Sequence, residues 1–426
     1  MALAMSPLRA QTQPSPPNPQ PTPSTPDSDS AALLLADQAP ATPERAKDWQ
    51  LAIEAALSQT HQRYGLGDLP GQRLSLDLQV DTRLGAQWRT VLSDQLDQRW
   101  QHHFNAPKAT NTLREAYLSW QPQPERAVDI GRINARFGVA MGYNPTDYFR
   151  AGANRSITSA DPASLKKNRQ GSVMLRGQTL WDGGSLTALL SPHLDDQPSD
   201  APFSLDVGAT NPRHRWLIAL TQRLTDSLQP QWLLYGEQQQ APQLGFNLTG
   251  VLGQASVAYI ETSVGRSRSQ LAQAVPGPDD RTLRTRLATG LTYTNNNRLS
   301  LTAEYQYNGA ALSANAWRAL AQPTPVAQAQ YLRYRLWLQS RLDLPTRQAV
   351  FLYASWQDAL LKQLDLTAML RLNTDDHSRL AWLEARYHWP RTDLALQWQN
   401  LHGRPGSEYG AAPHHQAVQL ALRYYY

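Results

Sequence analysis

Residues 282–308, TLRTRLATGLTYTNNNRLSLTAEYQYN, carry the pattern that decides the fold. Apolar and polar side chains alternate on both sides of Asn295-Asn296-Asn297, a tripeptide typical of turns. Alternation with a period of two indicates a β-strand, and two such runs around a short turn predict an antiparallel hairpin. Because similar runs recur further along the chain, the hairpin is one unit of a larger sheet. The clearest of these runs cover residues 363–372, 379–389 and 391–401.

Two kinds of sheet have one apolar and one polar face. A soluble sheet buries its apolar face against a second layer, whereas a membrane barrel turns that face towards lipid and its polar face towards a watery lumen. The predicted strands are about ten residues long, against about 5–6 in soluble proteins. Aromatic residues gather at strand ends, as in Tyr305 with Tyr307 and Tyr387 with Trp389. Both features are typical of a membrane barrel with aromatic girdles.

The composition excludes several classes of protein. The 426 residues contain no cysteine, which rules out disulfides, zinc–thiolate sites and cysteine nucleophiles. The densest apolar run, residues 31–36, is far shorter than the roughly 20 residues of a membrane helix, so an α-helical membrane protein is excluded. A net charge of +5 is too small to indicate nucleic-acid binding.

The C-terminal residues also favour a membrane barrel. Val418, Leu420, Leu422, Tyr424 and Tyr426 alternate with polar or small residues up to the last position of the chain. This pattern resembles the C-terminal strand signal of Gram-negative outer-membrane β-barrels, which the barrel-assembly machinery reads during biogenesis.

Two further segments, LREAYLSWQP (113–122) and GRINARFGVAMGYNPTDYF (131–149), are similar to parts of outer-membrane barrels of the porin and alginate-export kind. The resemblance implies an all-β fold, a single antiparallel transmembrane barrel over residues 49–426. It also implies an outer-membrane location among lipid and lipopolysaccharide, with both termini periplasmic. The implied function is that of a passive channel or export conduit, and no substrate is implied.

Counting strands gives an odd number at first. Long connections at 139–170, 193–213, 266–281, 309–346 and 402–414 alternate with short ones, and an earlier strand is needed to keep the long ones on one side. Residues 49–64 supply it, although their alanines also suit a helix, and the count becomes 18, with 16 as the alternative.

We predict a helix over 330–342 inside the 309–346 connection, after a shorter helix near 313–321. The seventeen other predicted strands cover residues 73–84, 87–99, 111–121, 125–138, 171–181, 185–192, 214–224, 230–238, 242–253, 255–265, 282–294, 298–308, 347–357, 363–372, 379–389, 391–401 and 415–426.

Residues 1–48 are predicted to be a disordered segment. Residues 11–26 are rich in Pro, Gln, Ser and Thr and cannot bury enough apolar surface to fold. The first ten residues, MALAMSPLRA, resemble the end of a secretory signal with Ala10 at the cleavage point, so we expect the true signal to begin upstream.

A barrel of 16 to 18 strands leaves an aqueous channel. The hypothesis is a conduit for polar, mainly anionic solutes or polymers, which meet arginines in the lumen. The alternative is that these arginines pair with acids on neighbouring strands and produce little field. A plugged barrel that serves as a scaffold or partner of a periplasmic or envelope-spanning transport system also stays open. The alternation places these charged residues on the lumen face: Arg284, Arg286, Glu304, Asp365, Arg371, Glu384, Arg386 and Arg423.

The connection at 139–170 is a candidate constriction. In porins a long loop can fold into the barrel, and Tyr143, Tyr148, Arg150 and Arg155 would then narrow the passage. The competing interpretation is an external loop that caps the barrel.

An enzyme is the least favoured interpretation. Ser191 and His193, with Asp195 and Asp196 nearby, have the residue types of an outer-membrane lipid hydrolase, but such residues are common in exposed loops. No Walker A, GxGxxG or HExxH sequence is present, and we predict no catalytic residues, no metal and no cofactor.

Overall fold

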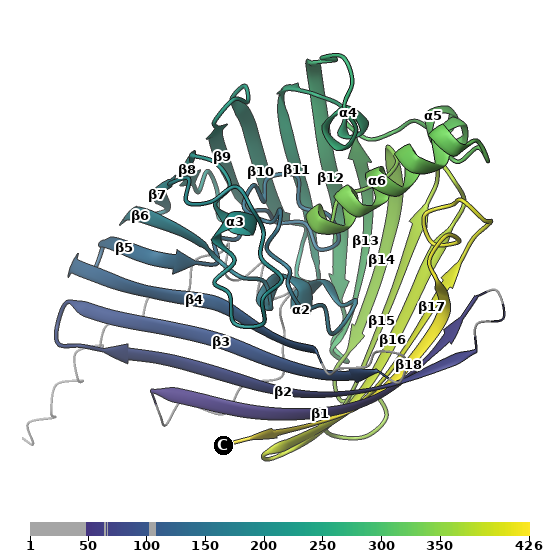
Figure 1. The fold of residues 1–426 in the computed structure, drawn as a ribbon. Coiled ribbons are helices and arrows are strands. Elements are labelled where there is room, and N and C mark those ends of the chain that lie inside the picture. Colours follow the sequence, from purple (N-terminus) through teal and green to yellow (C-terminus); the bar gives the residue numbers. More distant parts are fainter. Residues whose placement is uncertain (1–47, 64, 66, 102–107) are drawn as a thin grey trace, which may run out of the picture.

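The chain forms one closed barrel of eighteen antiparallel strands, as predicted (Figure 1). The computed structural model describes residues 48–63, 65, 67–101 and 108–426, so the predicted N-terminal segment lies, apart from Asp48, outside the described residues. Each strand pairs with its sequence neighbours, and β1 also pairs with β18. The strands are β1 (Trp49–Gln62), β2 (Asp68–Arg83), β3 (Trp88–Gln101), β4 (Lys108–Gln123), β5 (Arg126–Ile133), β6 (Ser172–Trp181), β7 (Gly184–Ser191), β8 (Arg215–Gln222), β9 (Leu228–Glu237), β10 (Gln243–Val251), β11 (Ser256–Ser267), β12 (Thr282–Thr294), β13 (Leu299–Asn308), β14 (Gln348–Trp356), β15 (Leu364–Asn373), β16 (Arg379–Trp389), β17 (Thr392–His402) and β18 (His414–Tyr425).

Side-chain exposure shows which way the sheet faces. In β13, Leu301 and Tyr305 are 45% and 38% exposed on the outside of the barrel, whereas Glu304 and Gln306 are 2% and 0% exposed on the inside. A soluble protein has the opposite arrangement, with leucine inside and glutamate outside. The barrel therefore presents an apolar outer surface, which is what lipid requires.

The connections divide between the two ends of the barrel. The described termini share one end with the short turns, of which residues 182–183, 295–298 and 390–391 are examples. The opposite end carries the long connections 134–171, 192–214, 268–281, 309–347 and 403–413. Residues 49–62 pair with β2 and β18, which confirms the first strand against the competing helix.

Helices occur only within connections in the described part of the chain. The 309–347 connection contains α5 (Ala314–Leu320) and α6 (Pro325–Arg341), so the predicted helix over 330–342 exists and begins five residues earlier. Its start follows from Thr324, whose hydroxyl accepts a hydrogen bond from the Ala327 amide, and from Pro325 in the first turn. Among the described residues, no helix is long and apolar enough to cross a membrane. The shorter helices are α2 (Pro162–Lys167), α3 (Val207–Thr210) and α4 (Gln270–Ala274).

Two strand boundaries were wrong by five residues. A strand over 73–84 was expected, but β2 begins at Asp68. A strand over 125–138 was expected, but β5 ends at Ile133, and from Val128 to Arg132 its pairing with both neighbours has no register shift. In the expected strand, the polar Asp129 and the apolar Phe137 would point to the same face unless a bulge lay between them. No bulge is needed, because Phe137 lies beyond the end of β5. The chain turns into the barrel there.

The outward leucines give a test of the membrane-facing surface. Leu383 lies halfway along β16 and Leu283 at the long-connection end of β12, and both are exposed on the outside. We expect Leu383→Arg to destabilise the folded barrel in lipid vesicles by about 2–4 kcal/mol and Leu283→Arg by about 0–1 kcal/mol, since the cost depends on depth in the bilayer. Urea titration of vesicle-inserted protein, followed by heat-modifiable gel mobility, measures both. Equal effects would contradict a lipid-facing belt.

Candidate functional site

The connection between β5 and β6, residues 134–171, folds back into the barrel and is called the inner loop below. Its backbone lies within the barrel (Figure 1), and it contacts inward-facing side chains of widely separated strands. Arg99 of β3 donates to the Ser156 hydroxyl at 2.8 Å, and Arg371 of β15 donates to the Gly142 carbonyl at 3.0 Å. The loop therefore crosses the interior and does not form an external cap.

A buried carboxylate, Glu261 of β11, holds the first anchor of the inner loop. It accepts hydrogen bonds from the backbone amides of Val139, Ala140 and Thr146 at 2.9, 3.0 and 2.8 Å. The Asn144 amide and the Thr146 hydroxyl donate to the same group. Such a ring of N–H donors stabilises a carboxylate that burial alone would penalise.

Glu304 of β13 holds the second anchor. Its carboxylate accepts from the backbone amides of Met141, Gly142 and Tyr143 at 2.9, 3.1 and 2.9 Å and from the Tyr259 hydroxyl at 2.7 Å. Gly142 is required here, because a Cβ would lie 2.6 Å from the ring of Phe351. Glu304 was predicted to line the pore, and its carboxylate is instead occupied by the inner loop.

An apolar contact fixes the next part of the loop. Tyr148 stacks on Tyr235 of β9 with ring centroids 4.3 Å apart, and Phe149 packs in the same cluster. The strand side of that cluster consists of apolar residues of β5 to β9: Ile133, Met174, Leu189, Leu217, Ala219, Leu233 and Tyr235. This side of the barrel is therefore filled.

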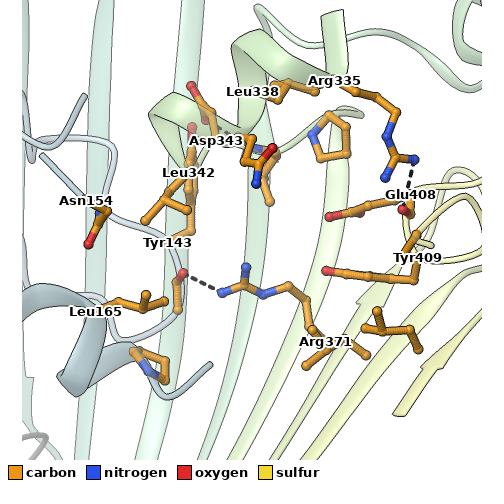
Figure 2. A pocket seen from close by; sticks show the side chains of 18 of the residues that line it. Tyr143, Asn154, Leu165, Arg335, Leu338, Leu342, Asp343, Arg371, Glu408 and Tyr409 are labelled. Atoms are coloured by element: carbon orange, nitrogen blue, oxygen red, sulfur yellow. Dashed lines mark hydrogen bonds between the residues drawn. The ribbon is translucent and has the colours of Figure 1, made fainter. Parts of the chain in front are cut away.

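Open space remains along the opposite wall. A vestibule of about 720 Å³ lies between α6, the inner loop, β15 to β18 and the 403–413 connection (Figure 2). It adjoins, through Gln399, a cavity of about 340 Å³ between β1 to β3, β16 to β18 and the inner loop. That cavity in turn adjoins a space of only about 70 Å³, with Gln397 and Gln419 on its wall. Each space shares lining residues with the next, and the volumes fall from the first space to the third. This series of spaces, which begins at the long-connection end, is called the funnel below.

Charged side chains line the narrow end of the funnel, and most of them form ion pairs. Arg73 lies 2.6 Å from Glu54, and Arg423 lies 2.7 Å from Asp77. With Arg386, three arginines and two carboxylates line this space. Of these five, only Arg386 and Arg423 were among the predicted pore residues, because the others lie on strands whose charges sequence reasoning did not single out.

Several predicted pore arginines have acidic partners. Arg386 is bound by Glu384 at 2.9 Å, and Arg284 pairs with Asp280 at 3.2 Å. Together with Arg423 and Asp77, these pairs match the alternative in which the arginines are neutralised by nearby acids. Asp365 contacts His388 at 3.3 Å near the short-turn end.

Other arginines of the interior have no carboxylate within 4.0 Å among the described residues. Arg371 bonds to a backbone carbonyl and lies over the ring of Phe351. Arg335 of α6 bonds to the Tyr331 hydroxyl and to two backbone carbonyls, and Arg99 bonds to residues of the inner loop. Arg286 likewise has no acid at ion-pair distance, although it lies close enough to Asp343 to favour the charged form of that acid.

The four predicted constriction residues divide into two pairs. Tyr143 and Arg150 line the vestibule, and Arg150 lies 3.2 Å from Asp343. Burial opposes ionisation of Asp343, but Arg150 and Arg286 outweigh it and lower the pKa of this acid. Tyr148 instead holds the loop to the wall through Tyr235 of β9. Arg155 joins the loop to the 192–214 connection, since it donates to the carbonyls of Ser204 and Ala201 at 2.5 and 2.8 Å.

The residues considered for a hydrolase are engaged elsewhere. The Ser191 hydroxyl donates to the Val173 carbonyl at 3.1 Å and accepts from Asn211 at 2.9 Å. His193 contacts Asp196 at 3.0 Å, and no hydrogen bond joins it to Ser191 in the described part of the chain. The Ser191 hydroxyl is thus not activated by a histidine.

Comparison with known proteins places the fold. Solved structures of OccAB4 and OccAB1 from Acinetobacter baumannii superpose with TM-scores of 0.53 and 0.56, at 9% and 8% identity. They cover 90% and 89% of this chain, and the match covers 100% and 96% of those chains. OccK2 (OpdF) from Pseudomonas aeruginosa has a TM-score of 0.54 at 12% identity, covering 89% of this chain and 97% of its own, and was also solved with glucuronate. No family profile and no curated protein sequence matches the chain. The fold is that of an outer-membrane β-barrel of the porin type.

The anchor formed by Glu304 can be tested by amide hydrogen exchange. In Glu304→Ala the amides of residues 141–143 lose their acceptor, and an orphaned buried donor costs about 1–3 kcal/mol. We expect mass spectrometry of the refolded protein to show exchange of these amides about tenfold faster or more. Glu384→Ala is the matched control, because Glu384 faces inward but, among the residues that the structure describes, bonds only Arg386 and Gln397. Unchanged exchange in the Glu304 variant would mean that the loop is held by other contacts.

Proposed function

We propose that the protein is an outer-membrane channel that passes small polar solutes, mainly anions, along the wall formed by β1 to β3 and β16 to β18. The observation that carries the proposal is the funnel of three adjoining cavities between this wall and the inner loop. The similarity in fold to OccK2, which binds glucuronate in one of its structures, is consistent with an acidic solute. The narrowness of the third cavity favours small solutes over polymers.

In this proposal the arginines act in two stages. An anion first meets Arg335 and Arg371 in the vestibule, where neither guanidinium is neutralised by an acid at ion-pair distance in the described chain. It next passes Arg99, which lines the middle cavity. At the narrow end Arg73 and Arg423 must exchange a wall carboxylate for the solute, so binding there is weaker and release is faster.

The orientation and biogenesis are part of the same proposal. The short-turn end would face the periplasm together with both termini, since external loops are the longer ones. Leu420, Leu422, Tyr424 and Tyr426 point outwards from the last strand, which joins β17 to β1. With Val418 they would form the signal for the barrel-assembly machinery, and lipid and lipopolysaccharide would surround the leucine belt.

A plugged scaffold is the competing function. The narrow space of about 70 Å³ is about a tenth of the volume of the vestibule, about 720 Å³, which favours this alternative for the barrel at rest. Single-channel recording separates the two functions, because a scaffold gives closed traces.

Substitution of the unpaired arginines tests the anion preference. We expect the refolded protein to conduct in planar bilayers and the reversal potential in a salt gradient to indicate anion selectivity. The double variant Arg99→Gln, Arg371→Gln should lower the anion-to-cation permeability ratio by about twofold or more, since it removes two charges from the wall of the passage. Arg284→Gln is the matched control, because Arg284 is paired with Asp280 and lies outside the three cavities. A wild-type channel without anion preference would refute this part of the proposal.

The selectivity should also depend on pH through Glu408 of the 403–413 connection. Burial raises the pKa of Glu408 above its ordinary 4.5, although Asn373 and Arg371 oppose the shift. On acidification Glu408 therefore takes up its proton above pH 4.5, and once neutral it no longer offsets Arg371. Anion preference should increase as the pH falls towards this raised pKa. Reversal potentials between pH 7.5 and 5 measure the effect; in Glu408→Gln the preference should be high throughout and the pH dependence should be reduced.

A further inference from the structure

The vestibule has apolar sides, which a channel for sugar-like solutes does not need. Leu332 and Leu336 lie one turn apart on α6, are each 59% exposed, and belong to the vestibule lining. Leu165 of α2, Leu380 of β16 and Leu401 of β17 line the same space from other elements. Leucines from three sides therefore surround the open volume.

These leucines are not needed to hold α6 in place. The helix packs through a different face, where Tyr334 and Leu338 are buried in a cluster with Trp317 and Leu320. Leu332 and Leu336 lie outside that cluster. Large apolar side chains left in contact with water are unfavourable unless something apolar covers them.

Two guanidinium groups lie next to this apolar surface. Arg335 follows Leu332 by three positions on α6 and reaches towards Glu408, whose backbone carbonyl accepts from it at 3.2 Å (Figure 2). Arg371 extends from β15 towards the segment that contains Tyr143 (Figure 2). Its Nε–H is buried and has no hydrogen-bond partner in the described chain. In the described chain both guanidinium groups bond only to neutral oxygen atoms, so their positive charges are available to an anion.

From this arrangement, and resting on the proposed channel function, we infer that the vestibule binds a small organic acid with one carboxylate on an aliphatic or aromatic body. The carboxylate pairs with Arg371 and Arg335, and the body covers Leu332 and Leu336. A volume of about 720 Å³ is in the range of about 300–1,000 Å³ found for small-molecule sites. A polyhydroxylated acid is disfavoured, because its hydroxyl groups would be desolvated against leucine without partners.

Two acids of equal length and charge form the matched probe pair. Hexanoate and gluconate each have six carbons and one carboxylate, and they differ in whether the body is apolar or hydroxylated. Isothermal titration calorimetry of the refolded full chain, against empty micelles as a blank, measures both. We expect hexanoate to bind about tenfold tighter than gluconate or better, since each buried methylene contributes.

Three variants assign the binding to its residues. Leu336→Ser should weaken the binding of hexanoate by about fivefold or more and leave the binding of gluconate unchanged, because the substitution removes apolar contact only. Val326→Ser is the control on the same helix, since Val326 is exposed and lies outside the vestibule lining. Arg371→Gln should weaken the binding of both acids. Heat-modifiable gel mobility confirms that each variant is folded.

The outcomes separate this inference from the channel function. Equal or tighter binding of gluconate, or equal effects of the Leu336 and Val326 variants, would overturn the apolar-acid site. Bilayer recording of the same preparations tests the channel independently. Hexanoate binding with closed traces would keep the site and refute the channel, whereas conductance without hexanoate preference would keep the channel and refute the site.

Discussion

Backbone N–H and C=O groups find no water in hydrocarbon, and this constraint shapes the rest of the molecule. A sheet can satisfy it only by closing, which β1 and β18 achieve with a register that places Leu57 beside Leu420. A closed sheet of eighteen strands, however, encloses an interior that is too wide for its own side chains to fill. The interior therefore has to be partly occupied by another segment of the chain, and its position determines where a passage remains.

The segment that occupies the interior faces the same constraint again. A loop inside a barrel carries amides that cannot all be paired within the loop. Glu261 and Glu304 each accept from three backbone amides of the inner loop. Two buried carboxylates would be unfavourable alone, and so would six unpaired amides, but each group satisfies the other. The loop is consequently held against β10 to β13, and the open space lies on the other side.

The period of two was sufficient to predict the strands, because each strand meets lipid on one face. Parity decided in favour of a strand near residues 49–62 despite their helical composition, because a closed barrel in which all neighbouring strands are antiparallel needs an even count. Anchoring by Glu261 was not predictable, because its partners at 139–146 lie more than a hundred residues away and leave no local pattern. The filled wall did leave a signal in the sequence. Strands β7, β8 and β9 contain apolar residues on both faces, in LTALL (186–190), WLIAL (216–220) and WLLY (232–235), where alternation should have left the inner face polar.

The distribution of acids along the passage bears on how a solute would leave it. An arginine without a counter-charge in a narrow, poorly hydrated space would bind an anion too firmly for rapid transit. Glu54 and Asp77 offset Arg73 and Arg423 at the narrow end, so a solute there competes with a carboxylate that is already in place. In the wider vestibule, water weakens each contact, and Arg335 and Arg371 can stay unpaired without trapping the solute. On this argument the acids of the wall would determine residence time, while the unpaired arginines would determine which solutes enter.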